Sequence, residues 1–175
     1  MIRARRTAAI LVVALLGITS VAFATTKFTG TNAANTIIGT TGPDAIDALG
    51  GNDTVLGRGY ADSIDGGSGN DTLYGDGTCP AGQTNLSYCS TAESQADGND
   101  NILGGSGNDT IYGQGGNDDI DGGSGADTIY GGSGNDQILA RDDTVDTIDC
   151  GSGTDKVTAD KNDIIASNCE TVSRK

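Results

Sequence analysis

Aspartates recur every nine residues through much of this chain, each after a run of glycines. The clearest unit is residues 66–74 (GGSGNDTLY), and it returns almost unchanged at residues 104–112, 122–130 and 131–139. Closely spaced glycines permit positive φ and tight turns, and such turns aim several carbonyl oxygens at one point. The aspartate at position six adds a carboxylate to them. Carbonyl and carboxylate oxygens are the ligands that Ca²⁺ takes, so the pattern predicts several calcium sites in the turns.

The candidate metal ligands are of two kinds, the position-six carboxylates and the glycines at positions two and four of each turn. The carboxylates are Asp44, Asp53, Asp62, Asp71, Asp100, Asp109, Asp118, Asp127 and Asp136. The glycines are Gly67, Gly69, Gly105, Gly107, Gly116, Gly123, Gly125, Gly132 and Gly134.

The last three residues of each unit predict a short strand whose middle side chain points inward. The inward residues are almost all β-branched, which favours strands over helices. They are Ile37, Ile46, Val55, Ile64, Leu73, Ile102, Ile111, Ile120, Ile129, Ile138, Ile148, Val157 and Ile165. We therefore expect an all-β fold, a right-handed parallel β-roll (β-solenoid) of nine-residue repeats with two repeats per coil.

The nine-residue period divides the chain into segments. Residues 25–38 hold a degenerate first unit with Asn35 in the aspartate place, and we expect them to cap the roll. Residues 39–76 and 97–158 carry the repeats, residues 77–96 form an insertion, and residues 159–175 are expected to form a C-terminal cap. In one turn Tyr60 replaces the fourth-position glycine; tyrosine resists positive φ, which predicts weaker ion binding there.

Four cysteines suit disulfides in an exported chain. Cys79 and Cys89 would pin the insertion as a surface or recognition loop, and Cys150 and Cys169 lie about one coil apart, within disulfide reach. Four cysteines allow three connectivities, and the sequence does not choose among them. A zinc site is disfavoured because the chain has no histidine and no Cys-x₂₋₄-Cys pair.

Residues 1–24 resemble a secretory signal peptide. Arg3, Arg5 and Arg6 precede an apolar stretch that is short for a membrane span, and Ala22-Phe23-Ala24 is typical of a cleavage site. We expect cleavage after Ala24 and secretion to the extracellular space; a retained anchor is the alternative.

The chain is strongly acidic. Losing the three arginines of residues 1–24 would change its net charge from −14 to −17. The remaining cations form no basic patch, which disfavours nucleic acid as a partner, and no other segment is expected to span a membrane.

Nothing in the sequence assembles a catalytic site. The absence of histidine removes the usual general base and the common zinc-hydrolase motifs, so we expect no enzyme activity. An EF-hand beginning at Asn117 is excluded, because Thr128 stands where that loop requires glutamate and no helix is expected beside it.

In these repeats the chain resembles the RTX, or haemolysin-type, calcium-binding family. The resemblance implies that position-six aspartates and glycine-turn carbonyls bind ions shared between turns one coil apart. The implied pairs are Asp44 with Asp62, Asp53 with Asp71, Asp100 with Asp118, Asp109 with Asp127, and Asp118 with Asp136. The chain lacks the large effector or catalytic domain of the best-known members, so their activities do not carry over.

The outward-facing residues allow a second interpretation of the protein's function. Tyr112 and Tyr130 are expected to stack on one face of the roll, and Tyr74, at the same outward position of an earlier repeat, is counted with them as a possible partner face beside threonines. Such a face could bind a polymer, a cell-surface glycan or ice, although regular rows arise in any regular repeat. Our main expectation is calcium-coupled folding, because a thin core and an acidic chain disfavour folding without the ion.

Overall fold

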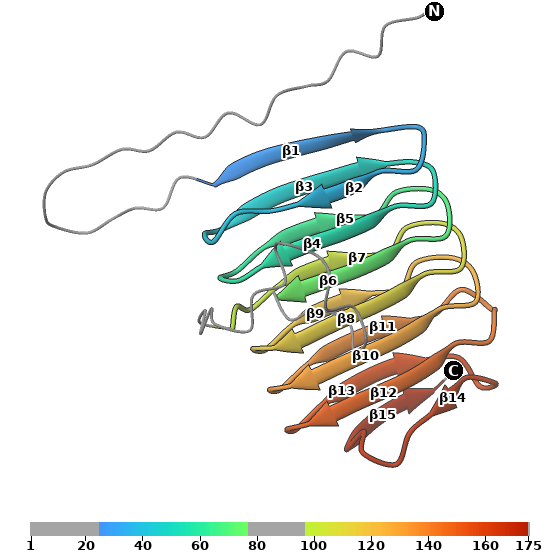
Figure 1. Ribbon diagram of the computed structural model, residues 1–175. Coiled ribbons are helices and arrows are strands. Elements are labelled where there is room, and N and C mark those ends of the chain that lie inside the picture. Colours follow the sequence, from blue (N-terminus) through green and yellow to red (C-terminus); the bar gives the residue numbers. More distant parts are fainter. Residues whose placement is uncertain (1–24, 77–96, 175) are drawn as a thin grey trace, which may run out of the picture.

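The structure is a computed structural model that describes residues 25–76 and 97–174. The expected signal peptide and the proposed Cys79–Cys89 pair lie outside these residues. The described residues contain strands and no helix, and the strands stack into an elongated roll with turns along both edges (Figure 1). Accordingly, no helix in residues 25–76 and 97–174 is long and apolar enough to cross a membrane.

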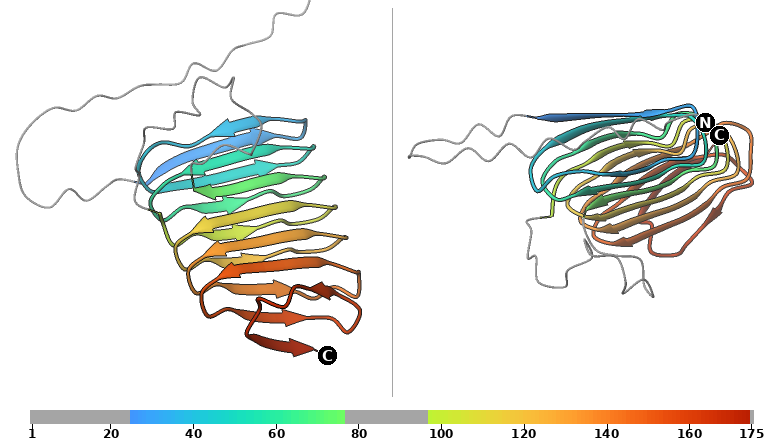
Figure 2. Two further views of the ribbon diagram at one scale, coloured as in Figure 1. Left: turned by 60° about the horizontal axis from the view of Figure 1, so that its bottom comes forward. Right: turned by 45° about the horizontal axis from the view of Figure 1, so that its top comes forward.

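Two parallel sheets form the walls of the roll, and alternate strands along the chain belong to opposite sheets (Figure 2). The eight-stranded sheet contains, in spatial order, β1 (Thr26–Thr31), β3 (Asp44–Leu49), β5 (Ser63–Asp65), β7 (Asn101–Leu103), β9 (Asp119–Asp121), β11 (Gln137–Ala140), β13 (Lys156–Ala159) and β15 (Thr171–Arg174). The seven-stranded sheet contains β14 (Ile164–Ile165), β12 (Thr147–Ser152), β10 (Thr128–Ser133), β8 (Thr110–Gly115), β6 (Thr72–Asp76), β4 (Thr54–Arg58) and β2 (Thr36–Ile38). The predicted parallel β-roll is confirmed.

From β1 to β11, apart from the insertion, each coil has the length that two nine-residue repeats predict, and the coils beyond β10 and β11 depart slightly from it. Thr36 pairs with Thr54, and Asp47 pairs with Asp65, so each residue meets its equivalent two repeats later. Equivalent side chains therefore stack directly above one another, and the inward residues form one continuous apolar ladder. All the predicted inward residues lie in it, with Ile165 partly buried at the end. The structure adds Phe28, Ala48, Ala140, Cys150 and Ala159 to this core.

The register continues across the insertion. Ile64 pairs with Ile102, and Tyr74 pairs with Tyr112. In each case the separation along the chain is one regular coil plus the full length of segment 77–96. Residues 76 and 97, which flank this segment, therefore stand at positions two and three of one turn, and the stack on either side is in register.

The terminal segments extend the same two sheets. Within residues 25–38, β1 pairs with β3 and β2 pairs with β4, so this segment is the first coil of the roll. Within residues 159–175, β14 pairs with β12 and β15 pairs with β13. Both segments lie at the ends of the stack, where we expected caps.

Candidate metal centres

Two ladders of carboxylates run along the two turn edges of the roll. In each ladder the backbone N–H of one position-six residue donates to Oδ1 of the aspartate one coil later. The Asp44 N–H lies 2.9 Å from Asp62 Oδ1, and the Asp53 N–H lies 2.8 Å from Asp71 Oδ1. The same bond joins Asp100 to Asp118, Asp109 to Asp127, and Asp118 to Asp136, with lengths of 2.8 to 2.9 Å. All five turn pairs implied by the family resemblance are thus neighbours.

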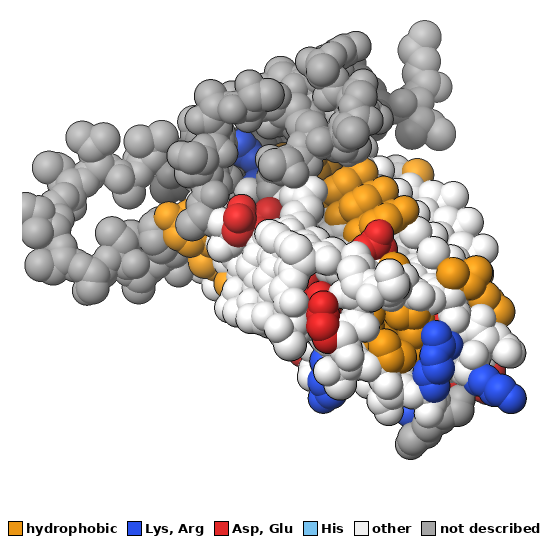
Figure 3. Space-filling model, turned by 90° about the horizontal axis from the view of Figure 1, so that it is seen from below, with side chains coloured by type: hydrophobic (Ala, Val, Ile, Leu, Met, Phe, Trp, Pro, Cys, Tyr) orange, Lys and Arg blue, Asp and Glu red, His pale blue; other side chains and the backbone are white. Residues whose placement is uncertain are grey.

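The second oxygen of these carboxylates has no partner. Oδ2 is buried and makes no hydrogen bond in Asp53, Asp62, Asp71, Asp100, Asp109, Asp118, Asp127, Asp136 and Asp155. On the face of the molecule that Figure 3 shows, few carboxylates are in view. A buried, unpaired carboxylate oxygen is costly unless something binds it, so each such atom is a candidate cation ligand.

Burial and mutual repulsion raise the pKa values of several of these groups, among them Asp100 and Asp118. Desolvation, followed by the charges of Asp76 and Asp62, raises the pKa of Asp100 to about 8. Desolvation, followed by the charges of Asp100 and further aspartates, raises that of Asp118 to about 8. Carboxylates at the roughly 4.8 Å spacing of strands repel by about 3–4 kcal/mol per pair at an effective dielectric constant of 20. A row of ionised aspartates therefore requires counter-charge.

The glycines at positions two and four have the backbone conformation that the sequence predicts. All nine candidate glycines have positive φ, for example 89° at Gly67 and 129° at Gly69. Tyr60 also has positive φ, at 66°, so its turn keeps the same backbone conformation in spite of its side chain. Tyrosine resists positive φ but does not prevent it here, and weaker ion binding in that turn remains a prediction.

The glycine at position one has a different role from the one that the sequence suggested. Gly66 and its equivalents are not among the residues with positive φ. A Cβ on Gly66 would lie 2.8 Å from Asp71 Oδ2 and 2.6 Å from the carbonyl oxygen of Gly104 in the next coil. Gly104 has the same surroundings, with Asp109 Oδ2 at 2.8 Å. In these two turns a side chain at position one would crowd both the unpaired carboxylate and the carbonyl of the next coil, although Ala48 and Cys150 hold the same position in other repeats.

Side chains alone do not complete a metal site. Residues 25–76 and 97–174 contain no group of three or more Cys, Asp or Glu side chains placed to hold one ion. Nine turns offer one orphaned carboxylate oxygen, most of them beside a carbonyl of the next coil, whereas Oδ2 of the predicted ligand Asp44 accepts the Thr40 N–H at 2.6 Å. Since Ca²⁺ takes six to eight oxygens, including backbone carbonyls, this donor set fits calcium. It does not fit zinc, which prefers sulfur and nitrogen in a small tetrahedral site.

Comparison with known proteins agrees with this chemistry. The model of the RTX calcium-binding nonapeptide repeat matches residues 29–59, 49–77, 96–129, 115–144 and 122–157, which cover more than half of the chain. The chain belongs to this family of calcium-binding repeats. None of the curated proteins or solved structures compared with it matches significantly.

The RTX ladders extend beyond the residues that the sequence singled out. One continues from Asp136 to Asp155, whose own N–H donates to Glu170, and the other continues from Asp127 to Asp146 and Asp163. The hydrogen-bond lengths are 2.8 to 3.1 Å, as in the regular repeats. Along the chain, these aspartates follow the preceding member of their ladder by slightly more or slightly fewer residues than a regular coil contains. A search for a strict nine-residue period therefore misses them.

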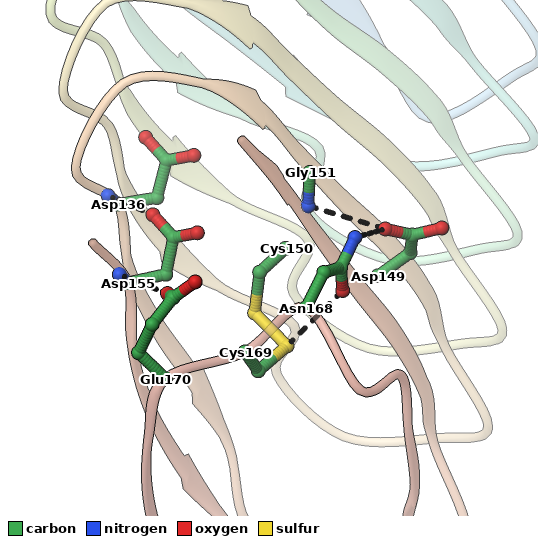
Figure 4. Close-up of a disulfide and its surroundings, with 8 residues drawn as sticks. All are labelled: Asp136, Asp149, Cys150, Gly151, Asp155, Asn168, Cys169 and Glu170. Atoms are coloured by element: carbon green, nitrogen blue, oxygen red, sulfur yellow. Dashed lines mark hydrogen bonds between the residues drawn. A yellow bond between two sulfur atoms is a disulfide. The ribbon is translucent and has the colours of Figure 1, made fainter. Parts of the chain in front are cut away.

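A disulfide fixes this C-terminal part of the RTX stack. Cys150 and Cys169 are bonded, with Cα atoms 5.2 Å apart, as their one-coil separation predicted. Figure 4 shows the bond beside the last members of one ladder, Asp136, Asp155 and Glu170. Cys150 is completely buried and occupies position one of its repeat.

Asp76, which is buried, and Asp142, which is half-buried, also lie in RTX turns, although neither stands at position six. Both Asp76 oxygens lie 3.1 Å from the Gly98 N–H, so this side chain joins the two ends of the insertion. Desolvation, followed by the charge of Asp97, raises the pKa of Asp76 to about 6. Asp142 accepts the Gly125 N–H at 2.6 Å, a role that a serine carbonyl fills in regular turns.

The predicted stack of Tyr112 on Tyr130 is present, and Tyr74 extends it. The ring centroids of Tyr74 and Tyr112, and of Tyr112 and Tyr130, are 4.8 Å apart with nearly parallel planes. Both faces of the Tyr112 ring are therefore covered by its neighbours. A sugar that binds by stacking on a ring face would find only the outer face of Tyr130, so the stack gives no specific support to glycan binding.

Proposed function

We propose that this chain is a secreted calcium-binding protein whose RTX repeats fold when Ca²⁺ binds in the turns of the roll. The nine buried Oδ2 atoms without partners carry this proposal. Eight of them lie in consecutive turns, and most lie next to a glycine and a carbonyl oxygen of the neighbouring coil. The oxygen-rich, histidine-free donor set supports calcium over transition metals.

The proposed mechanism couples binding to folding. Bound Ca²⁺ would supply the positive charge that the two carboxylate ladders need. The chain's own contribution is geometric: each position-six N–H fixes Oδ1 of the next aspartate, and this leaves Oδ2 free to act as a ligand. Because each coil contacts only its neighbours, ordering one turn favours the next, so we expect cooperative binding.

Far-ultraviolet circular dichroism during calcium titration tests this function. The purified protein, first treated with a chelator, should change cooperatively from coil to β-structure as calcium rises, whereas magnesium should be much less effective. A β-spectrum that neither chelator nor calcium changes would contradict it. Amino-terminal sequencing of exported protein tests secretion and should give Thr25 as the first residue.

A further inference from the structure

The N-terminal end of the roll presents an unpaired strand edge. β1 is the outermost strand of its sheet and pairs only with β3 (Figures 1 and 2). The Thr26 N–H donates to the Pro43 carbonyl at 3.2 Å, so Thr26 and Phe28 bond toward β3. The backbone groups of Lys27 and Thr29 consequently face away from the roll. Within residues 25–76 and 97–174, no strand pairs with that side of β1.

This end is also the least acidic part of the molecule. All 24 acidic residues lie at position 44 or beyond, and residues 25–43 carry one charged side chain, Lys27. The first turn uses Asn35 in the aspartate place, and the Asn35 amide oxygen accepts the Thr31 N–H at 2.6 Å. Two acidic copies of the chain could therefore meet at this end without bringing carboxylates together.

At the opposite end of the roll β15 is likewise an outermost strand, but side-chain contacts and a disulfide hold the last coil. Arg174 on β15 donates to the carbonyl oxygens of Asp160, Lys161 and Asp163, each at 3.1 Å. The Cys150–Cys169 disulfide holds the last coil in place. Stacking of the first coil of one copy on the last coil of another would have to displace these contacts. Any pairing between copies is thus favoured at the two N-terminal ends.

We propose that β1 pairs antiparallel with β1 of a second copy, about a twofold axis at Phe28. In this register Lys27 lies opposite Thr29 of the second copy, and each such pair exchanges two backbone hydrogen bonds. The two Phe28 residues become direct neighbours across the axis. Phe28 packs against the apolar core, so the cores of both rolls would join through an aromatic pair. The contact is self-complementary and closes as a dimer.

The side chains of β1 are compatible with this register. Strand alternation points Phe28 inward and Lys27 and Thr29 outward. Lysine on an edge strand usually discourages pairing. Here Lys27 would face a neutral threonine of the second copy, and the two lysines would not oppose each other.

Sedimentation equilibrium of the purified, calcium-loaded protein tests the dimer, after mass spectrometry has established its N-terminus. We expect twice the monomer mass. Thr29→Pro removes an outward N–H without removing a bond to β3, and proline is tolerated at such positions of edge strands. This variant should be monomeric, with an unchanged calcium-induced circular dichroism transition.

A matched control exists on β15, at the C-terminal end of the roll. The Thr171 N–H donates to the Asp155 backbone carbonyl at 3.0 Å, so the neighbouring Val172 N–H faces outward on β15. Val172→Pro should leave the dimer intact. A monomeric unmodified protein, or a dimer that Val172→Pro dissociates and Thr29→Pro does not, would overturn the proposal.

Cross-linking tests the register itself, and it remains informative if Thr29→Pro does not fold. Phe28→Cys should form a covalent dimer on mild oxidation, since the two sulfurs would meet at the axis. Thr31→Cys should not, because its copies would lie about 20 Å apart along the strands. Equal cross-linking of both variants, or none by Phe28→Cys, would overturn the register.

Discussion

The backbone N–H of Asp62 donates a 2.8 Å hydrogen bond to Oδ1 of Asp100, which lies beyond the insertion along the chain. Asp71 is joined to Asp109 in the same way, at 2.7 Å. These two bonds carry both carboxylate ladders across the position of the insertion. If calcium binds as proposed, the turns on either side of segment 77–96 therefore belong to one cooperative array.

Replacing Asp100 should weaken calcium binding. Asp100→Asn keeps an acceptor for the Asp62 N–H but removes the charge of a buried, unpaired oxygen. We expect the calcium concentration at the midpoint of folding to rise by roughly 10- to 100-fold. Replacing a residue that only supports a metal ligand typically lowers metal affinity by this factor. Circular dichroism titration measures this midpoint. The control is Asp65→Asn on the outer face of β5, which should leave it unchanged.

Adding a methyl group at position one should damage a turn. The Cβ of Gly66→Ala would meet Asp71 Oδ2 and the Gly104 carbonyl, and both are fixed by the stack. We expect a loss of about 1–3 kcal/mol in the free energy of unfolding with calcium present. Ser68→Ala in the same turn is the control, because Ser68 is exposed. Urea denaturation compares them, and equal stability would argue against a crowded site.

Without calcium, the roll should become less stable as pH rises. Burial first, then neighbouring charges, raise the pKa values of Asp100 and Asp118 to about 8 and that of Asp62 to about 7, from an ordinary value of 3.8. The folded state therefore binds more protons than the unfolded chain between about pH 4 and 8. Its stabilisation is complete below pH 4 and is lost as pH rises through 8.

Far-ultraviolet circular dichroism of the chelator-treated protein at pH 4, 5, 6, 7 and 8 measures this dependence. The β-structure that remains without calcium should be greatest at low pH and fall as pH rises, and saturating calcium should restore it at the higher pH values because protons and calcium compete for the same oxygens. More β-structure at pH 8 than at pH 4 in chelator would contradict the burial of ionisable carboxylates in the turns.

Removing the disulfide should loosen only the C-terminal coil. Replacing Cys150 and Cys169 together by alanine should cost about 3 kcal/mol locally, as expected for a loop of this size. Hydrogen exchange should show faster amide exchange in β14 and β15 and little change in β3 to β6, because each coil contacts only its neighbours. Uniformly faster exchange would mean that the roll unfolds as a single unit.

The sequence alone determined the repeat, the strands and the inward ladder. Each unit encodes its own turn and strand, so a period of nine residues predicts both the coil and the stacking of Asp44 on Asp62. Glycine at positions two and four predicted positive φ for the same local reason. These features depend on contacts within one coil or between adjacent coils of fixed length.

Only the tertiary structure decided which turns lie next to each other where the number of residues between them departs from the regular coil length. The continuity from Asp62 to Asp100 required knowing where segment 77–96 leaves the roll, and Asp146, Asp163 and Glu170 joined the ladders although their spacing departs from the regular coil length. The packing role of Gly66 was likewise hidden, because its crowding comes from Gly104 in the next coil. Hydrogen bonds between coils respond to distance in space, and a change of chain length between two turns does not prevent them.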